Sequence, residues 1–145
     1  MTILNALNDH QPDHGAGFAT AVCLAYKPGD RILTWSVAGH LPPVMRLVEG
    51  TVETLSHTVG PPLDVDPSFE YRDQAIQVSP GTLLVLYTDG LIERRDESID
   101  VSLKRLVTEL EAAPPTPKAA VDHLLNGFLS HPSSDDVAIV GALFP

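Results

Sequence analysis

Alternating apolar and polar positions predict a series of antiparallel strands along the first part of the chain. In FATAVCLAYK (18–27), large side chains alternate with small ones, which is typical of a strand covered on both faces. Turns at 28–30 (PGD) and at Glu49-Gly50 each join two such segments, which predicts two hairpins. We expect Phe18 and Trp35 to lie in the core. The predicted strands are 18–27, 31–38, the two arms of 44–55, 69–78 and 82–88.

The apolar spacing becomes helical in the second part of the chain. In 102–112, apolar residues recur at i, i+3, i+4 and i+7, which is one face of a helix. The segment 113–117 (APPTP) ends this helix, and Thr116 is suited to cap a second helix that has Pro117 at its first position. We expect that helix to reach about Leu129. A last buried strand is predicted at 135–144.

The order of these elements indicates the fold class. Several antiparallel strands come first, two helices follow and one strand ends the chain. Such a segregated order is typical of α+β proteins with helices packed on a sheet. A length of 145 residues favours one domain, which we expect to span 1–145.

Composition and charge narrow the classes of function. The formal net charge is −10, from 19 acidic and 9 basic residues, and the only adjacent basic pairs are Arg94-Arg95 and Lys104-Arg105. Binding to a phosphate backbone needs clusters of Lys and Arg, so we do not expect a nucleic-acid partner. An acidic excess suits a soluble protein and also a site that concentrates cations.

The same counts indicate the compartment. No apolar run approaches the roughly 18 residues of a spanning helix, and the first residues, MTILNALNDH, lack the pattern of a signal peptide. We therefore expect no membrane association. Cys23 is the single cysteine, which excludes an internal disulfide and a cysteine zinc site. A reducing, cytoplasmic setting fits this composition best.

Acidic residues stand at the ends of two predicted strands. Asp89 follows LLVLYT, and Asp135-Asp136 precede VAIVGAL. If these strands are antiparallel neighbours, Asp89 and Asp135 converge at one edge of the sheet. Magnesium and manganese prefer such oxygen ligands. The alternative is structural: Asp-Gly after a strand is an ordinary turn, and Ser-Ser-Asp-Asp before a strand is an ordinary exposed loop.

The order of five motifs resembles the C-terminal half of bacterial PPM-type metal-dependent serine/threonine phosphatases, specifically the SpoIIE/RsbU-like branch. The resemblance implies an antiparallel β-sandwich flanked by helices. It also implies a phosphoprotein substrate of the anti-sigma-factor antagonist type and two Mg²⁺ or Mn²⁺ ions, which activate a water for in-line attack on phosphorus. The motifs are FATA (18–21), AGHLPP (38–43), VGPPL (59–63), PGTLLVLYTDGLIE (80–93) and DDVAIV (135–140).

Carried over onto this chain, the resemblance makes Asp89 and Asp135 metal ligands, with Asp136 as the second choice beside Asp135. The role of His40 stays open between an acid for the leaving serine oxygen and a hydrogen bond that holds its loop. Glu93 either positions a water at the metals or is a solvated acid of the turn. No covalent intermediate is implied, so Cys23 is not a candidate nucleophile.

The family domain is longer than this chain. The match begins at ILNALND (3–9), which resembles the end of the family's second helix, and the family's upstream GDVxGHG-like motif, which bridges both metals, has no counterpart. Asp13 in PDHGAG lies in the wrong place to replace it. Asp64 stands where the family usually has glycine.

We therefore expect a partial domain that is inactive alone. Two alternatives stay open, a non-catalytic phosphatase-like binding module and a half-domain that completes its fold by homo-oligomerisation through uncovered sheet surface.

Overall fold

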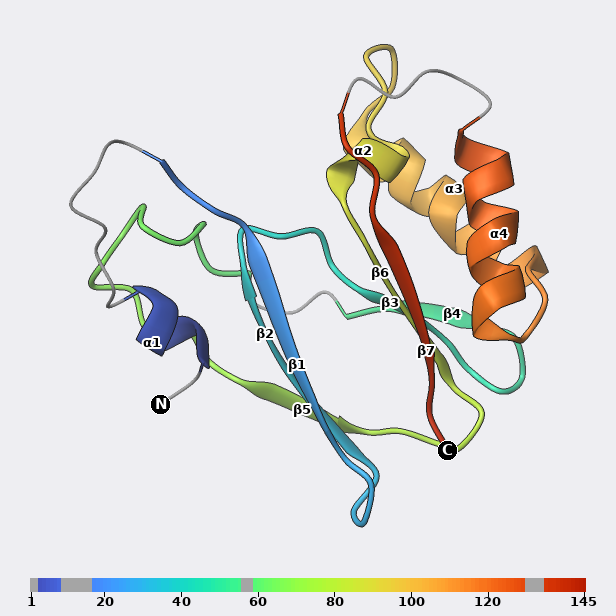
Figure 1. Ribbon diagram of the computed structural model, residues 1–145, viewed down its shortest axis with the longest axis horizontal. Helices are drawn as coiled ribbons and strands as arrows, with labels where there is room; N and C mark the ends of the chain where they lie inside the picture. The colour runs from blue at the N-terminus through green and yellow to red at the C-terminus, as the bar shows by residue number, and fades with distance from the viewer. Residues whose placement is uncertain (1–2, 9–16, 56–58, 130–134) are drawn as a thin grey trace. The chain divides into compact units, whose positions relative to one another are not determined.

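The computed structural model describes residues 3–8, 17–55, 59–129 and 135–145 of the chain. They form two compact units (Figure 1). Unit 1 comprises Met1–His40 and Ser56–Val78, and unit 2 comprises Leu41–Leu55 and Ser79–Pro145. Each unit has its own antiparallel sheet and its own core. The expected α+β class is confirmed, and the expectation of one domain over 1–145 stays a prediction.

Unit 1 contains a three-stranded antiparallel sheet in the order β1-β2-β5. The hairpin predicted around 28–30 is confirmed, with Ala21 opposite Ala38 and Lys27 opposite Ile32. The short helix contributes Leu4 to a core that also contains Ala38 and Tyr71. The elements of this unit are α1 (Ile3–Asn8), β1 (Ala21–Lys27), β2 (Ile32–Ala38) and β5 (Gln74–Gln77).

β5 is shorter than the strand predicted at 69–78. The main-chain N–H of Tyr71 donates to Oδ1 of Asn5 at 2.7 Å, and the Tyr71 carbonyl accepts from Nδ2 of Asn5 at 3.2 Å. Both main-chain groups of Tyr71 are therefore satisfied by a side chain of α1. This pairing explains why the ladder with β2 begins only at Gln74.

The burial predicted for the first two strands is only partly correct. Trp35 on β2 is buried, as expected. Phe18 precedes β1 and is 71% exposed, so its assignment to the core is wrong. β1 is also not covered on both faces along its whole length, because Ala25 and Lys27, which lie on one face, are exposed. Alternation of large and small residues does not establish that both faces of a strand are covered.

Unit 2 contains a four-stranded antiparallel sheet in the order β4-β3-β6-β7. The hairpin predicted at 44–55 is confirmed, with Val44 opposite Thr54. Figure 1 shows α3 and α4 side by side against this sheet. The elements are β3 (Val44–Arg46), β4 (Val52–Thr54), β6 (Leu83–Tyr87), α2 (Asp89–Ile92), α3 (Ile99–Ala112), α4 (Pro117–Phe128) and β7 (Ile139–Leu143).

The core of unit 2 lies between the helices and one face of the sheet. α3 contributes Leu106 and Leu110, and α4 contributes Leu124 and Phe128, all of them buried. Val85 at the centre of β6 is fully buried against them. The apolar spacing that predicted helices therefore identified the faces that pack.

Of three predicted boundaries in unit 2, one is confirmed and two lie elsewhere in the structure. Thr116 is the N-cap residue of α4 and Pro117 is its first residue, as predicted, although the Thr116 side chain makes no capping hydrogen bond. α3 begins at Ile99, before the predicted start. β7 begins at Ile139 and is an edge strand with Val140 56% exposed, so the buried strand expected over 135–144 is wrong in start and in burial.

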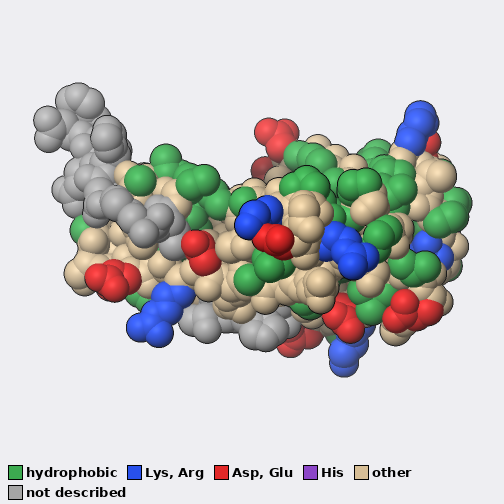
Figure 2. Space-filling model, turned by 90° about the horizontal axis from the view of Figure 1, so that it is seen from below, with side chains coloured by type: hydrophobic (Ala, Val, Ile, Leu, Met, Phe, Trp, Pro, Cys, Tyr) green, Lys and Arg blue, Asp and Glu red, His purple; other side chains and the backbone are tan. Residues whose placement is uncertain are grey.

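The surface carries several large apolar side chains. Ile3, Phe18, Val48 and Val140 are each more than half exposed. On the face seen in Figure 2, apolar side chains lie among separate acidic and basic ones. No helix among the described residues is long and apolar enough to cross a membrane.

Candidate metal centre

The pairing of β6 with β7 determines where the predicted ligands lie. The two strands are antiparallel neighbours, with Leu83 opposite Leu143 and Tyr87 opposite Ile139. Asp89 follows the end of β6, and Asp135 and Asp136 precede the start of β7. The expectation that these segments meet at one edge of the sheet is confirmed. The roles of the aspartates as metal ligands remain predictions.

Thr88 joins the two segments directly. Its main-chain N–H donates to the carbonyl of Ala138 at 3.0 Å, and its hydroxyl accepts a hydrogen bond from the Ala138 N–H at 2.9 Å. The same hydroxyl lies 3.1 Å from the carbonyl oxygen of Asp136, to which it donates. The chain around Asp136 is thereby bonded to the residue before Asp89.

Gly90 brings the segments closer still. A Cβ atom on Gly90 would lie 2.3 Å from the carbonyl oxygen of Asp136 and 3.1 Å from that of Asp135. Real Cβ atoms do not approach carbonyl oxygens this closely, so glycine is required by the contact. The glycine of the Asp-Gly pair therefore permits close approach of two backbones, a role that a turn reading of the sequence missed.

The aspartate carboxylates are oriented locally. Oδ1 of Asp89 accepts a hydrogen bond from the Gly90 N–H at 2.9 Å, and Oδ1 of Asp135 accepts one from the Asp136 N–H at 2.8 Å. All three aspartates are exposed.

Glu93 lies one helical turn beyond Asp89. It is the C-cap residue of α2, and its main-chain N–H donates to the carbonyl of Asp89 at 2.7 Å. Its side chain is exposed. His40 is the last residue of the first segment of unit 1, whereas the aspartates belong to unit 2. The α2 turn therefore holds Glu93 next to Asp89. The proposed roles of Glu93 and His40 stay predictions.

The donor set fits a hydrated divalent cation in its chemistry. Asp89, Asp135 and Asp136 offer hard carboxylate oxygens at one sheet edge, which suits Mg²⁺ or Mn²⁺. Within the four described ranges, no three His, Cys, Asp or Glu side chains are grouped closely enough to hold an ion. The described residues thus supply part of a coordination shell, and Asp13 lies outside them.

Cys23 does not have the environment of a reactive thiol. Burial raises the pKa of Cys23, and the carboxylate of Asp73 raises it further. A raised pKa keeps the thiol protonated at neutral pH, whereas a nucleophilic cysteine needs the thiolate. The expectation that Cys23 is not a nucleophile stays a prediction.

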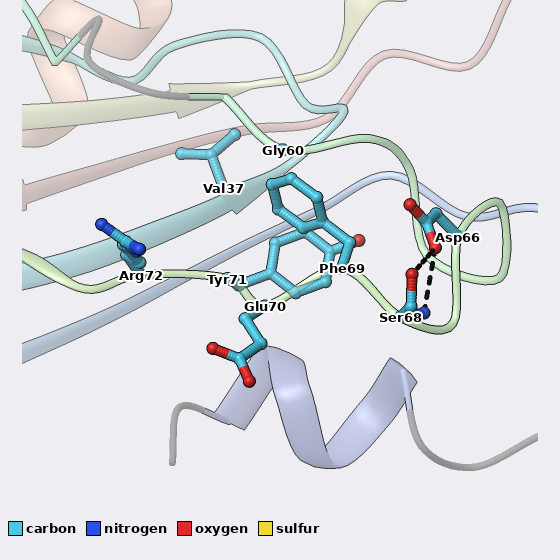
Figure 3. A pocket seen from close by; sticks show the side chains of 8 residues that line it. All are labelled: Val37, Gly60, Asp66, Ser68, Phe69, Glu70, Tyr71 and Arg72. Atoms are coloured by element: carbon cyan, nitrogen blue, oxygen red, sulfur yellow. Dashed lines mark hydrogen bonds between the residues drawn. The ribbon is translucent and has the colours of Figure 1, made fainter.

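Unit 1 contains a pocket of ≈ 550 Å³ that sequence reasoning did not identify (Figure 3). The rings of Phe69 and Tyr71 meet edge to face at 5.0 Å, and both lie against Gly60. Burial, with the carboxylates of Asp64 and Asp66, raises the pKa of Tyr71. No predicted site residue is among its walls, which are Val37, Gly60, Asp66, Ser68, Phe69, Glu70, Tyr71 and Arg72.

One family model matches nearly the whole chain. The family described as Stage II sporulation protein E (SpoIIE) matches residues 1–144. No protein of curated function matches the chain by sequence.

Solved structures with a similar fold include the following three. The RsbU and RsbW domains of a Mycobacterium tuberculosis protein share 22% identity, with a TM-score of 0.73 over 84% of this chain and 35% of that one. The manganese-soaked phosphatase domain of Bacillus subtilis SpoIIE shares 18%, with a TM-score of 0.68 over 86% and 56%. A PPM Ser-Thr phosphatase from Mycobacterium smegmatis, in complex with cacodylate, shares 18%, with a TM-score of 0.60 over 89% and 64%. The chain thus spans less than two thirds of each.

Proposed function

Because the chain belongs to the SpoIIE family, we propose that it is the C-terminal part of a Mg²⁺- or Mn²⁺-dependent phosphoserine/phosphothreonine protein phosphatase. One observation carries the proposal. The antiparallel register of β6 and β7, with Tyr87 opposite Ile139, puts Asp89 and the Asp135-Asp136 segment at the same sheet edge. The soaking of the SpoIIE phosphatase domain with manganese supports the choice of metal.

In this proposal the aspartates set the position of the metal ions and do not attack the substrate. Asp89 and Asp135 are the first ligands, and Asp136 is the alternative beside Asp135. When bound by these residues, two such ions would supply a water of lowered pKa and would neutralise charge on the phosphoryl group. Glu93, one turn from Asp89, orients a water, and His40 donates a proton to the leaving oxygen or holds its loop.

The proposed substrate is a phosphorylated signalling protein of the anti-sigma-factor antagonist type, in the cytoplasm. Support comes from the similarity to an RsbU domain and to the SpoIIE phosphatase domain. The acidic net charge of −10 favours accumulation of cations at the surface. It also favours a substrate region that does not add further negative charge close to the site.

The test compares the unaltered protein with two variants. We expect the protein encoded by the complete reading frame to hydrolyse p-nitrophenyl phosphate and a phosphoserine protein only with Mn²⁺ or Mg²⁺. Loss of a residue that only orients a metal ligand typically costs about 10–100-fold in activity. Asp89→Asn removes a proposed ligand itself, so we expect it to lower kcat by at least about a hundredfold. Asp96→Asn is the matched control, since Asp96 is an exposed acid of the following turn. Equal rates for Asp89→Asn and the unaltered protein would refute the role of Asp89.

The 145-residue chain itself is proposed to bind Mn²⁺ weakly and to lack turnover. The absence of a group of three ligands among the described residues supports this. Robust Mn²⁺-dependent hydrolysis by the purified chain would contradict it. No Mn²⁺ binding at millimolar concentration in calorimetry would instead favour a phosphatase-like module that only binds its partner protein.

Self-association is the remaining alternative, and β7 supplies the surface for it. β7 is an edge strand with the sequence IVGAL, which contains no charge or proline, and Val140 and Leu143 are 56% and 46% exposed. Edge strands of this kind pair readily with a further strand. Sedimentation equilibrium tests it: a dimer that Val140→Lys converts to a monomer supports pairing through β7, and a clean monomer excludes it.

A further inference from the structure

The side chain of Thr88 takes the place of a main-chain group in the β6–β7 ladder. The last residue pair of the ladder is Tyr87 with Ile139. Immediately beyond it, the Ala138 N–H donates to the hydroxyl oxygen of Thr88 at 2.9 Å. In a continuing antiparallel ladder, the acceptor would be the main-chain carbonyl of Thr88. The hydroxyl is free to donate in turn, and it donates to the Asp136 carbonyl at 3.1 Å.

This arrangement sets the path of the chain that carries Asp135 and Asp136. One hydroxyl contacts the main chain at two positions, residues 136 and 138. Thr88 makes a third hydrogen bond through its main-chain N–H, which donates to the Ala138 carbonyl at 3.0 Å. The next residue along the chain is Asp89. Thr88 therefore couples the position of one proposed ligand to that of the others.

The hydrogen bonds of the Thr88 hydroxyl are accessible to water. Their effect on the position of the aspartates can therefore be distinguished from their effect on stability. Thr88 is half-buried, and Asp136 and Ala138 are exposed. Water can replace the hydroxyl as a partner for both main-chain groups, so the loss of the hydroxyl costs little in global stability. Water cannot hold the two segments at a defined separation. The position of Asp135 and Asp136 is thus more sensitive to Thr88 than the fold is.

We propose that Thr88 is a positioning residue for divalent-cation binding. It holds the Asp135-Asp136 segment against the strand end that presents Asp89. This rests on the proposed function of these aspartates as ligands. Partners that orient ligands typically contribute about 10–100-fold to metal affinity.

The experiment measures the Mn²⁺ dissociation constant of the 145-residue chain, from the free-ion electron paramagnetic resonance signal. Thr88→Val keeps the shape of the side chain and removes the hydroxyl, and we expect it to weaken Mn²⁺ binding about tenfold. Thr88→Ser keeps the hydroxyl, and we expect it to bind within about twofold of the unaltered chain. Amide exchange at Ala138 should accelerate in Thr88→Val and stay slow in Thr88→Ser.

Thr82→Val is the matched control. Thr82 directly precedes β6 at its other end and is 1% exposed, and its hydroxyl has no hydrogen-bond partner in the part of the chain that the structure describes. We expect it to leave both Mn²⁺ affinity and Ala138 exchange unchanged. If Thr88→Val does not fold, Thr88→Ala against Thr88→Ser still compares two small side chains that differ only in the hydroxyl.

The outcomes separate this inference from the proposed function. If the unaltered chain binds no Mn²⁺, the proposed ligands fail and the role of Thr88 fails with them. If the unaltered chain binds Mn²⁺ and Thr88→Val binds it equally well, the positioning role alone is overturned. Weaker binding by Thr88→Val with restoration by serine supports the role, and weaker binding by Thr88→Ser as well as Thr88→Val overturns the assignment to the hydroxyl.

Discussion

Gly90 and Asp136 come so close that there is no room for a side chain on Gly90. A Cβ there would lie 2.3 Å from the Asp136 carbonyl oxygen and 3.0 Å from its carbonyl carbon. Both contacts are with main-chain atoms, which cannot rotate aside as the end of a long side chain can. The segment before β7 can therefore approach α2 this closely only because Gly90 has no Cβ atom.

Gly90→Ala should push these segments apart. Alanine favours a helix over glycine by about 1 kcal/mol, but the clash with the main chain should outweigh this and destabilise unit 2 by about 1–3 kcal/mol. Because Asp136 must move, Mn²⁺ binding should weaken as well. Thermal unfolding followed by far-UV circular dichroism and a Mn²⁺ titration measure the two effects.

Gly127→Ala is the control for that substitution. Gly127 also lies in a helix, but the nearest atoms to its added Cβ belong to the Glu109 side chain, at 3.5 Å and beyond. We expect it to stabilise the protein by up to about 1 kcal/mol and to leave Mn²⁺ binding unchanged. Stabilisation by both variants would show that the approach of Gly90 to Asp136 is not restrictive.

Tyr87→Phe tests the connection between β6 and the loop before β3. The Tyr87 hydroxyl, on a residue only 3% exposed, donates to the Pro42 carbonyl at 2.9 Å. Removing the hydroxyl leaves that carbonyl without this donor, and we expect a loss of about 1 kcal/mol in the free energy of unfolding at pH 7. Urea unfolding of the two proteins measures the difference.

The difference should shrink at alkaline pH. Burial raises the pKa of Tyr87 well above its ordinary value of 10.0. Above that value the unfolded chain loses the Tyr87 proton while the folded chain keeps it, so stability falls with rising pH by about 1.4 kcal/mol per unit. Tyr87→Phe lacks this contribution. A gap between the two proteins that stays constant from pH 9 to pH 11 would contradict the assignment.

The parts of the site that follow from periodicity could be predicted from the sequence. The apolar run before Asp89 and the one after Asp136 are strands, and because they pair as antiparallel neighbours the aspartates reach one edge. The helical spacing in 102–112 likewise identified Leu106 and Leu110 as buried. Such predictions succeed because the period of the apolar residues directly reflects which face is covered.

The contacts that support the site could not be predicted in the same way. The bond from the Ala138 N–H to Thr88 depends on the pairing of residues 50 positions apart, which no local pattern encodes. The predictions that Phe18 and Val140 are buried were wrong for a related reason. Both side chains are apolar, but their exposure depends on which elements lie beside them in the fold. Strand order is a tertiary property, and the sequence period does not contain it.

Asp64 illustrates a sequence departure that the structure explains. Asp64, where the resemblance implies glycine, has φ = +66°, in the left-handed region. Asp64→Gly should remove the strain of this conformation, but glycine also raises the entropy of the unfolded chain. We therefore expect the free energy of unfolding to change by no more than about 0.5 kcal/mol. Asp64→Ala keeps the strain and should cost about 1 kcal/mol. Fluorescence of the single, buried Trp35 follows unfolding of unit 1, and equal stability of the two variants would argue against strain at this position.

Asn8 connects α1 to the loop that contains Asp64, and its replacement should loosen that loop. Asn8 is 2% exposed; its Oδ1 accepts from the Asp64 N–H at 3.1 Å, and its Nδ2 donates to the Asp66 carbonyl at 3.0 Å. Asn8→Ala removes both bonds, and we expect a loss of about 1–3 kcal/mol in unit 1 together with faster amide exchange at Asp64. Asn8→Asp keeps the acceptor but places a carboxylate against the Asp66 carbonyl, so it should be at least as destabilising at pH 7. Asn126→Ala, at an exposed position of α4, should leave the Asp64 amide unchanged. If Asn8→Ala also leaves that amide protected, α1 does not hold the loop.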